Sequence, residues 1–406
     1  MYEFLFLCLC FVQYRIGPVS LADWALIALD FLAIISGRAV YSTNRERRIG
    51  EVLIFVGAMI SLMFNAFKPW FSIFEFVGSA GKLALYLVSL GLLPKFLKTK
   101  RINVTKILSF YIYFISVNAV FQLIVIHLFG RYNAILRILY GVVSDHEAMY
   151  RYHQLVRVRT FYNEPGFMAI HLALLFIIIL FVKKDLPLKL HLAYLISVGL
   201  TVSLSALFIT VGIYLIYYWN PCNRKKMINM LGGVFLIALS LIIIVIKVDF
   251  IRLRLSLLFS SNDRSAIIRT VGTFHYLLDT PWYGTGIGNN ALYYQSLGWG
   301  DTYYYSEGGE AFNVLVVIAL TMGYIGLIGI LIYQYSFLKT NKKLFLSFIL
   351  SDFGWGLVFS TPIWTFLLMY DLAVEERNSY FVSEGKGRSL KRLPRISFYP
   401  KFPRSP

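Results

Sequence analysis

The fold of this chain is decided by residues 157–182, RVRTFYNEPGFMAIHLALLFIIILFV. The second part, Ala169–Val182, is apolar except for one histidine, and with the residues just before it the run reaches the roughly 17–25 residues that cross a bilayer. Directly in front of it stand Arg157, Arg159 and Glu164. Charges at the edge of hydrocarbon are costly and tend to mark functional sites. The stretch therefore predicts a transmembrane helix with a charged cluster at its mouth.

The composition extends this interpretation to the whole chain. Of the 406 residues, 58% are hydrophobic and 15% are charged, whereas soluble domains are roughly half apolar and about a quarter charged. Apolar runs of similar length recur at Leu21–Gly37, Ile107–Phe129, Ile228–Val248 and Ala311–Leu338. The sequence therefore predicts an all-α, polytopic helical membrane protein, with no soluble domain of useful size between its spans.

The basic residues predict how the chain crosses the membrane. The net charge is +18, and most of the positive charges fall in short segments between apolar runs, a pattern that fixes topology and does not indicate a nucleic-acid partner. If these clusters are cytoplasmic, the chain has about 12 transmembrane helices with both termini inside, and the first helix is retained instead of being cleaved as a signal peptide. The predicted spans are 2–14, 20–37, 49–66, 82–96, 106–129, 166–182, 190–204, 205–220, 229–248, 311–338, 344–354 and 356–372.

This topology divides the chain into a membrane domain, 1–372, and a basic cytoplasmic tail, 373–406, that is predicted to be disordered. Two long loops, about 130–165 and 249–310, then lie outside. Together they contain nine arginines and no lysine, although external loops are usually poor in basic residues.

Arginine pairs bidentately with phosphate or carboxylate, whereas lysine acts as a point charge. The external arginines either contact lipid headgroups and nearby acids, or they bind an anionic ligand. For Arg159 and Arg269, which each lie a few residues from a predicted membrane re-entry, we favour the ligand.

Glu164 and Pro165 open the predicted helix, and two interpretations of the acid stay open. Proline suits the first turn of a helix, and a carboxylate there meets the positive end of the helix dipole, so Glu164 could simply cap the helix and pair with Arg159. Alternatively, an ionisable pair at a membrane boundary is a candidate site. In that case Arg159 holds an anionic group, while Glu164 orients the arginine or accepts a proton.

The second external loop contains a glycine-rich turn and many aromatic residues. Gly284-Thr285-Gly286-Ile287-Gly288 lacks the strand and helix of a dinucleotide-binding fingerprint. Its amide groups could approach a phosphate, or the segment is an ordinary turn; both remain open. The aromatic residues either belong to the membrane interface or stack on sugar rings; they are Tyr293, Tyr294, Trp299, Tyr303, Tyr304 and Tyr305.

Three motifs follow one another along residues 105–338. They are Arg159 with Phe161-x-x-Glu164-Pro165; Ser265 and Arg269 ahead of Pro281 and Gly284-x-Gly286-x-Gly288; and Asn313 at the start of a long predicted helix that contains Gly323, Gly326 and Gly329. In order and spacing they resemble the oligosaccharide repeat-unit polymerases of bacterial envelopes, the Wzy proteins, which form one superfamily with the O-antigen ligases. Gly166 departs from the serine that often follows Glu-Pro in this family. Phe312 stands where ligases carry a histidine, which favours a polymerase.

The resemblance implies a metal-independent glycosyltransferase that polymerises oligosaccharide repeat units, linked to undecaprenyl pyrophosphate, into O-antigen, capsule or exopolysaccharide. It implies a multi-pass protein of the bacterial cytoplasmic (inner) membrane with its active site on the external or periplasmic side. No cofactor is expected, and the implied partners, besides substrate and bilayer, are chain-length regulator and flippase proteins. The catalytic residues are then Glu164, Arg159 and Arg269, and the substrate-binding residues are Arg157, Arg264, Asn313, Gly284 and Gly286.

Two alternatives remain at this stage. One is a ligase-type transferase that moves finished glycan to another acceptor, against which Phe312 counts. The other is a polysaccharide flippase or exporter, which would line a central cavity with ionisable groups, whereas here such groups gather in the external loops.

Overall fold

The computed structural model describes residues 1–16, 19–37, 45–100, 102–129, 158–162, 164–183, 186–201, 203–218, 273–298, 314–340, 342–352 and 364–373, with Ile135, Leu136 and Leu139. Helices dominate this part of the chain; its strands form one short antiparallel hairpin, β1 (Arg15–Ile16) and β2 (Val19–Ser20). The helices are α1 (Tyr2–Cys8), α2 (Leu21–Ile35), α3 (Arg45–Asn65), α4 (Ile73–Thr99), α5 (Val104–Phe129), α8 (Pro165–Val182), α9 (Leu188–Leu200), α10 (Leu204–Tyr218), α14 (Thr273–Asp279), α15 (Asn290–Ser296), α16 (Val314–Thr340) and α17 (Lys342–Asp352). Residues 364–373 are helical as well.

Five of the described helices are long and apolar enough to cross a membrane: α3, α4, α5, α8 and α16. The helices α9 and α10 are apolar but shorter. The prediction of an all-α membrane protein is therefore confirmed. The number of about 12 spans and the two long external loops stay predictions, because residues 229–248 and most of the residues of both loops lie outside the described residues.

Most predicted span ends differ from the observed helix ends by a few residues, and three spans differ by more. The helix α1 ends at Cys8, so it covers only the first half of the predicted span 2–14. The helix α4 begins at Ile73, nine residues before the predicted start, where Ser72 is its N-cap. The predicted continuous span 311–338 is interrupted at Gly323, whose backbone is not helical (φ 68°, ψ −170°).

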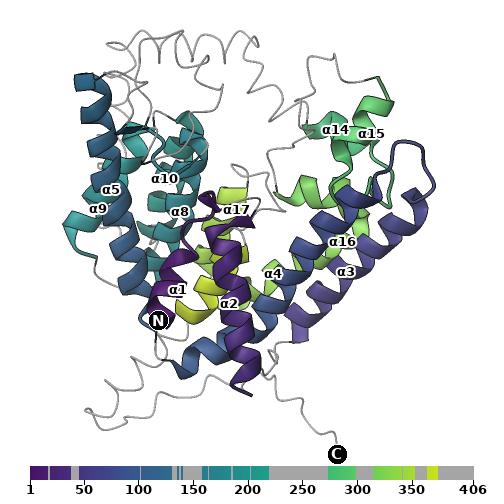
Figure 1. Cartoon of the computed structure of the whole chain (residues 1–406), viewed down its shortest axis with the longest axis horizontal. Coiled ribbons are helices and arrows are strands. Elements are labelled where there is room, and N and C mark those ends of the chain that lie inside the picture. The colour runs from purple at the N-terminus through teal and green to yellow at the C-terminus, as the bar shows by residue number, and fades with distance from the viewer. Residues whose placement is uncertain are drawn as a thin grey trace, which may run out of the picture.

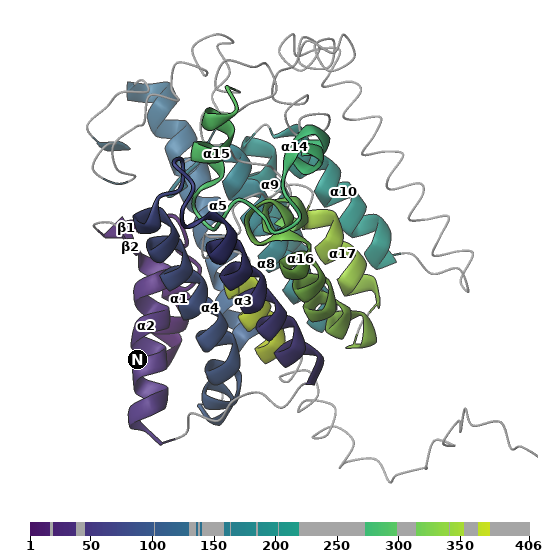
Figure 2. The same ribbon diagram turned by 90° about the vertical axis from the view of Figure 1, so that its right-hand side faces the viewer.

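Figure 1 shows how these helices are arranged. The helices α5, α8, α9 and α10 lie on one side, α3 and α16 lie on the other, and α1, α2 and α17 lie between them. The short helices α14 and α15 sit at the upper end beside α16. The view in Figure 2, turned by 90°, shows α3 and α16 side by side.

The helix α8 is the most enclosed of the five long apolar helices. It packs against α5, α9, α10 and α17. Its side chains are apolar on all sides, as expected for a helix inside a bundle. The residues that precede α8 therefore lie at the end of a helix that is surrounded by α5, α9, α10 and α17.

The helices α3 and α16 pack through glycines in an antiparallel arrangement. A Cβ atom added at Gly57 would lie 2.7 Å from the Gly326 nitrogen, and one added at Gly50 would lie 2.7 Å from the Gly329 oxygen. Small residues let helix backbones approach closely, which is how helices associate in a bilayer that offers no hydrophobic driving force between them.

Candidate functional site

The segment in front of α8, Val158–Tyr162 with Glu164, is fastened through its backbone; we refer to it as the 158–164 segment. The Gln122 Oε1 atom on α5 accepts hydrogen bonds from the Arg159 and Thr160 amides, at 3.1 and 2.8 Å. The Val158 amide donates to the Leu200 carbonyl at the end of α9, at 3.0 Å. The segment is thus bound to two neighbouring helices before α8 begins.

A chain of side-chain hydrogen bonds lies under this segment. The Tyr162 hydroxyl is 2.6 Å from His171 Nδ1 on α8 and 2.8 Å from the Tyr111 hydroxyl on α5. Burial raises the pKa of Tyr162 well above its ordinary value, so its hydroxyl stays neutral. The neighbouring ring of Phe161 stacks on Phe114 with 5.7 Å between centroids. Both side chains therefore anchor the segment to the core.

Glu164 is the N-cap residue of α8, with extended backbone angles, and Pro165 follows at the first helical position. The helix start predicted from the Glu-Pro pair is therefore confirmed. The partly buried Glu164 side chain makes no capping hydrogen bond. Among the described residues no ion pair joins it to Arg159 either. Glu164 thus has the position expected of a helix cap. In the described part of the chain its carboxylate makes neither the capping hydrogen bond nor an ion pair with Arg159.

Of the predicted site residues, Arg159 and Glu164 lie together on this one segment. Metal binding is not indicated in the part of the chain that the structure describes, since no group of three or more His, Cys, Asp or Glu side chains there could hold an ion. Four predicted residues lie outside the described residues: Arg157, Arg264, Arg269 and Asn313. Their roles remain predictions.

The other two predicted residues, Gly284 and Gly286, lie on the turn between α14 and α15, which fills the break in α16. The amide of Thr285 donates to the Leu320 carbonyl at 2.7 Å, and the amide of Gly286 donates to the Thr321 carbonyl at 3.1 Å. Both glycines have positive φ angles, 80° and 89°. A Cβ at Gly284 would lie 2.5 Å from the Gly323 nitrogen. The turn and the break therefore fit each other.

Side chains of α3 and the backbone of Ser72, the N-cap residue of α4, make further hydrogen bonds around the same turn. Asn65 Nδ2 donates to the Gly284 carbonyl at 2.9 Å, and Ser61 Oγ donates to the Thr321 carbonyl at 3.0 Å. The Ser72 amide donates to Asn289 Oδ1 at 2.7 Å. These bonds give the turn a packing role. A phosphate contact through the glycine amides stays a prediction. It would have to replace the bond from the Gly284 amide to the Pro281 carbonyl and the bond from the Gly286 amide to the Thr321 carbonyl on α16.

Of the six aromatic residues that the sequence singled out in the second loop, Tyr293 and Tyr294 are described, and both contact protein groups. Tyr294 is fully buried, and its hydroxyl lies 2.8 Å from Thr280 Oγ1. The Tyr293 hydroxyl donates to the Asp279 carbonyl at 2.8 Å, and its ring packs edge-on against Trp70. Burial raises the pKa of both tyrosines. Trp299, Tyr303, Tyr304 and Tyr305 lie outside the described residues.

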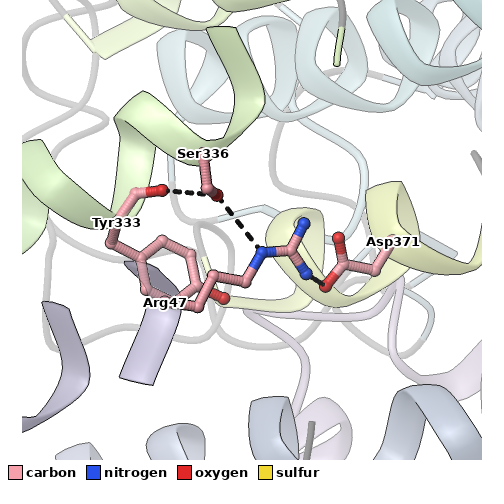
Figure 3. Close-up of polar contacts among 4 residues, drawn as sticks. All are labelled: Arg47, Tyr333, Ser336 and Asp371. Atoms are coloured by element: carbon pink, nitrogen blue, oxygen red, sulfur yellow. Dashed lines mark hydrogen bonds and ion pairs between the residues drawn. The ribbon is translucent and has the colours of Figure 1, made fainter. Parts of the chain in front are cut away.

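A buried polar cluster that the sequence did not predict lies at the other end of α3 (Figure 3). Arg47 Nη1 forms an ion pair with the Asp371 carboxylate, and Arg47 Nε donates to Ser336 Oγ at 3.2 Å. Ser336 Oγ in turn donates to the Tyr333 carbonyl at 2.7 Å. We call these residues the Arg47 cluster. The one feature of the sequence that could have indicated this cluster is Asp371, an acid at the end of an apolar run. No local pattern indicates that its partner is Arg47.

Comparison with models of protein families finds no match to this chain, and comparison with curated proteins finds none either.

Proposed function

We propose that this protein is a membrane glycosyltransferase that joins oligosaccharide repeat units carried on undecaprenyl pyrophosphate, and so lengthens a bacterial surface polysaccharide. The observation that carries the proposal is the position of the Glu164 carboxylate and its lack of a capping hydrogen bond or an ion pair with Arg159 among the described residues. The carboxylate stands at the N-terminus of an enclosed apolar helix, on a fixed segment that also bears Arg159. The order of motifs shared with the Wzy proteins supports the proposal.

The chemistry follows from the nature of the donor. The acceptor hydroxyl attacks the anomeric carbon of the lipid-linked chain, a new glycosidic bond forms, and the bond to the pyrophosphate oxygen breaks. Glu164 accepts the hydroxyl proton as a general base. Arg159, with Arg269, stabilises the negative charge on the departing lipid pyrophosphate. Arg157, Arg264 and Asn313 bind the substrate in this proposal. The leaving group is already attached to the donor, so no nucleotide sugar is needed.

Replacing Glu164 by Gln tests the proposal. The variant keeps the size of the side chain but cannot accept a proton as a base, so polysaccharide gels should show loss of the ladder above one repeat unit, at an unchanged level of membrane-inserted protein. The matched control is Glu75→Gln, an exposed acid in the first turn of α4, which should leave the ladder intact. A normal ladder from Glu164→Gln would remove the carboxylate from the chemistry. A ladder that persists in a deletion strain would refute the polymerase altogether.

The external position of the site has its own test. In a background with all three native cysteines replaced, single cysteines at the exposed positions Lys68 and Ser296 should react with an impermeant thiol reagent in intact spheroplasts. A cysteine at the exposed Lys342 should react only after lysis, because it lies in a predicted cytoplasmic cluster. The reverse pattern of labelling would invert the topology and rule out an external active site.

A further inference from the structure

Thr160 holds an unusual backbone conformation within the 158–164 segment. Its φ angle is +47°, and among the described residues other than glycine it is the only one with a positive φ. A β-branched side chain in this region is a genuine outlier. Such strain persists only when the surroundings over-determine it, and it gathers at functional sites. The question is therefore which group holds Thr160 in this conformation.

Two sets of hydrogen bonds hold it: the Tyr162 amide donates to the Arg159 carbonyl at 3.0 Å across the turn that contains Thr160, and Gln122 on α5 fixes the residues before it. The Gln122 Oε1 atom accepts from the amides of Arg159 and Thr160. These amides belong to the two peptide units on either side of the Arg159 Cα atom. One carbonyl oxygen thus fixes both planes, and with them the direction in which the Arg159 side chain leaves the backbone. Gln122 itself is buried on α5, far from Arg159 in the sequence.

We propose that Gln122 is a positioning residue that aims Arg159 at the pyrophosphate of the substrate. Its two hydrogen bonds to the Arg159 and Thr160 amides, together with the strained backbone of Thr160, hold the segment in one conformation; we call this arrangement the lock. The proposal rests on the proposed function. A glutamine suits this position because its amide oxygen has two lone pairs for two backbone donors. Binding geometry prepared in this way lowers the cost of ordering the arginine when the substrate arrives.

The test compares three variants of the full-length protein. Gln122→Met keeps length and removes the acceptor, Gln122→Glu keeps an acceptor oxygen, and Asn118→Leu is the control. Asn118 lies one turn away on α5, and its side chain donates to the Phe114 carbonyl of its own helix. Hydrogen exchange of the peptide that contains 158–162 reports on the lock, and the polymer ladder reports on the reaction.

We expect Gln122→Met to speed exchange at residues 159 and 160 by tenfold or more and to slow chain extension by a similar factor. Gln122→Glu should restore both toward the native values, and Asn118→Leu should change neither. Rescue by an acceptor oxygen is not expected of a residue that merely fills space. Native exchange in Gln122→Met, or native extension despite fast exchange, would overturn the proposal.

A second variant serves if Gln122→Met does not fold. Thr160→Gly removes the strain, because glycine adopts positive φ readily, and it leaves Gln122 in place. We expect residues 159 and 160 to exchange faster and chain extension to slow, because glycine lets the backbone of the segment move more freely. Native exchange and extension in this variant would refute the lock. If the native protein made no polymer, the proposed function would fail, while the exchange results would still decide whether Gln122 fixes Arg159.

Discussion

The 158–164 segment and the Arg47 cluster each bring an arginine and a carboxylate to the end of a helix, yet they use them differently. In the cluster, Arg47 is bonded to Asp371 and to Ser336, all three side chains are largely buried, and the residues come from distant parts of the chain. On the segment, Arg159 and Glu164 are five residues apart, and among the described residues no ion pair joins these two to each other. The ion pair of the cluster therefore stabilises the fold, whereas Arg159 and Glu164 do not neutralise each other.

The largest effect on stability is expected from breaking the Arg47 cluster. Arg47→Met leaves the Asp371 carboxylate buried without its counter-charge, which typically costs about 3–5 kcal/mol of unfolding free energy. Thermal unfolding of the protein in detergent should show a marked loss of stability. The double variant Arg47→Met with Asp371→Leu should recover most of it, because an apolar pair of similar volume replaces the ion pair. If the single variant is as stable as the native protein, the cluster is not structural.

A smaller effect is expected from the glycine contact that joins α3 to α16. Gly57→Ala places a Cβ atom 2.7 Å from the Gly326 nitrogen, and such overpacking costs about 1–3 kcal/mol. The same unfolding experiment measures the loss. Gly78→Ala on α4 is the control, because a Cβ there meets nothing within 4 Å, and it should be neutral or slightly stabilising. Equal behaviour of both variants would mean that the two helices are free to separate.

The smallest effect on stability, under about 1 kcal/mol, is expected from Arg159→Lys, which keeps the positive charge. Its effect on activity should be large, because lysine cannot bind a phosphate group bidentately. Loss of one charge-assisted hydrogen bond of about 1.5–3 kcal/mol predicts a rate of chain extension lower by about tenfold or more. The control is Arg45→Lys, an exposed residue at the start of α3, which should change neither quantity. Native extension by Arg159→Lys would show that only positive potential matters.

Local sequence patterns predicted the start of α8 and the membrane class, because a proline at the first helical position and an apolar run are both local signals. The break in α16 was not predictable in this way. Gly323 alone is compatible with a helix, and its break is filled by a turn from another part of the chain. Gln122 was missed for the same reason, since nothing near it in the sequence points to Arg159. The pairing of Arg47 with Asp371 likewise joins residues 324 positions apart.

The glycine contact between α3 and α16 also has a consequence for biogenesis. During synthesis α3 enters the membrane long before α16 has been made. Until then the glycine face of α3 contacts lipid or another helix. This costs little free energy, because lipid tails are as apolar as the helix that later replaces them. The turn between α14 and α15 precedes α16 in the chain but needs the broken helix to satisfy its amide groups. Insertion of α16 is thus the step that covers the glycine face of α3 and supplies the carbonyl groups for the turn between α14 and α15.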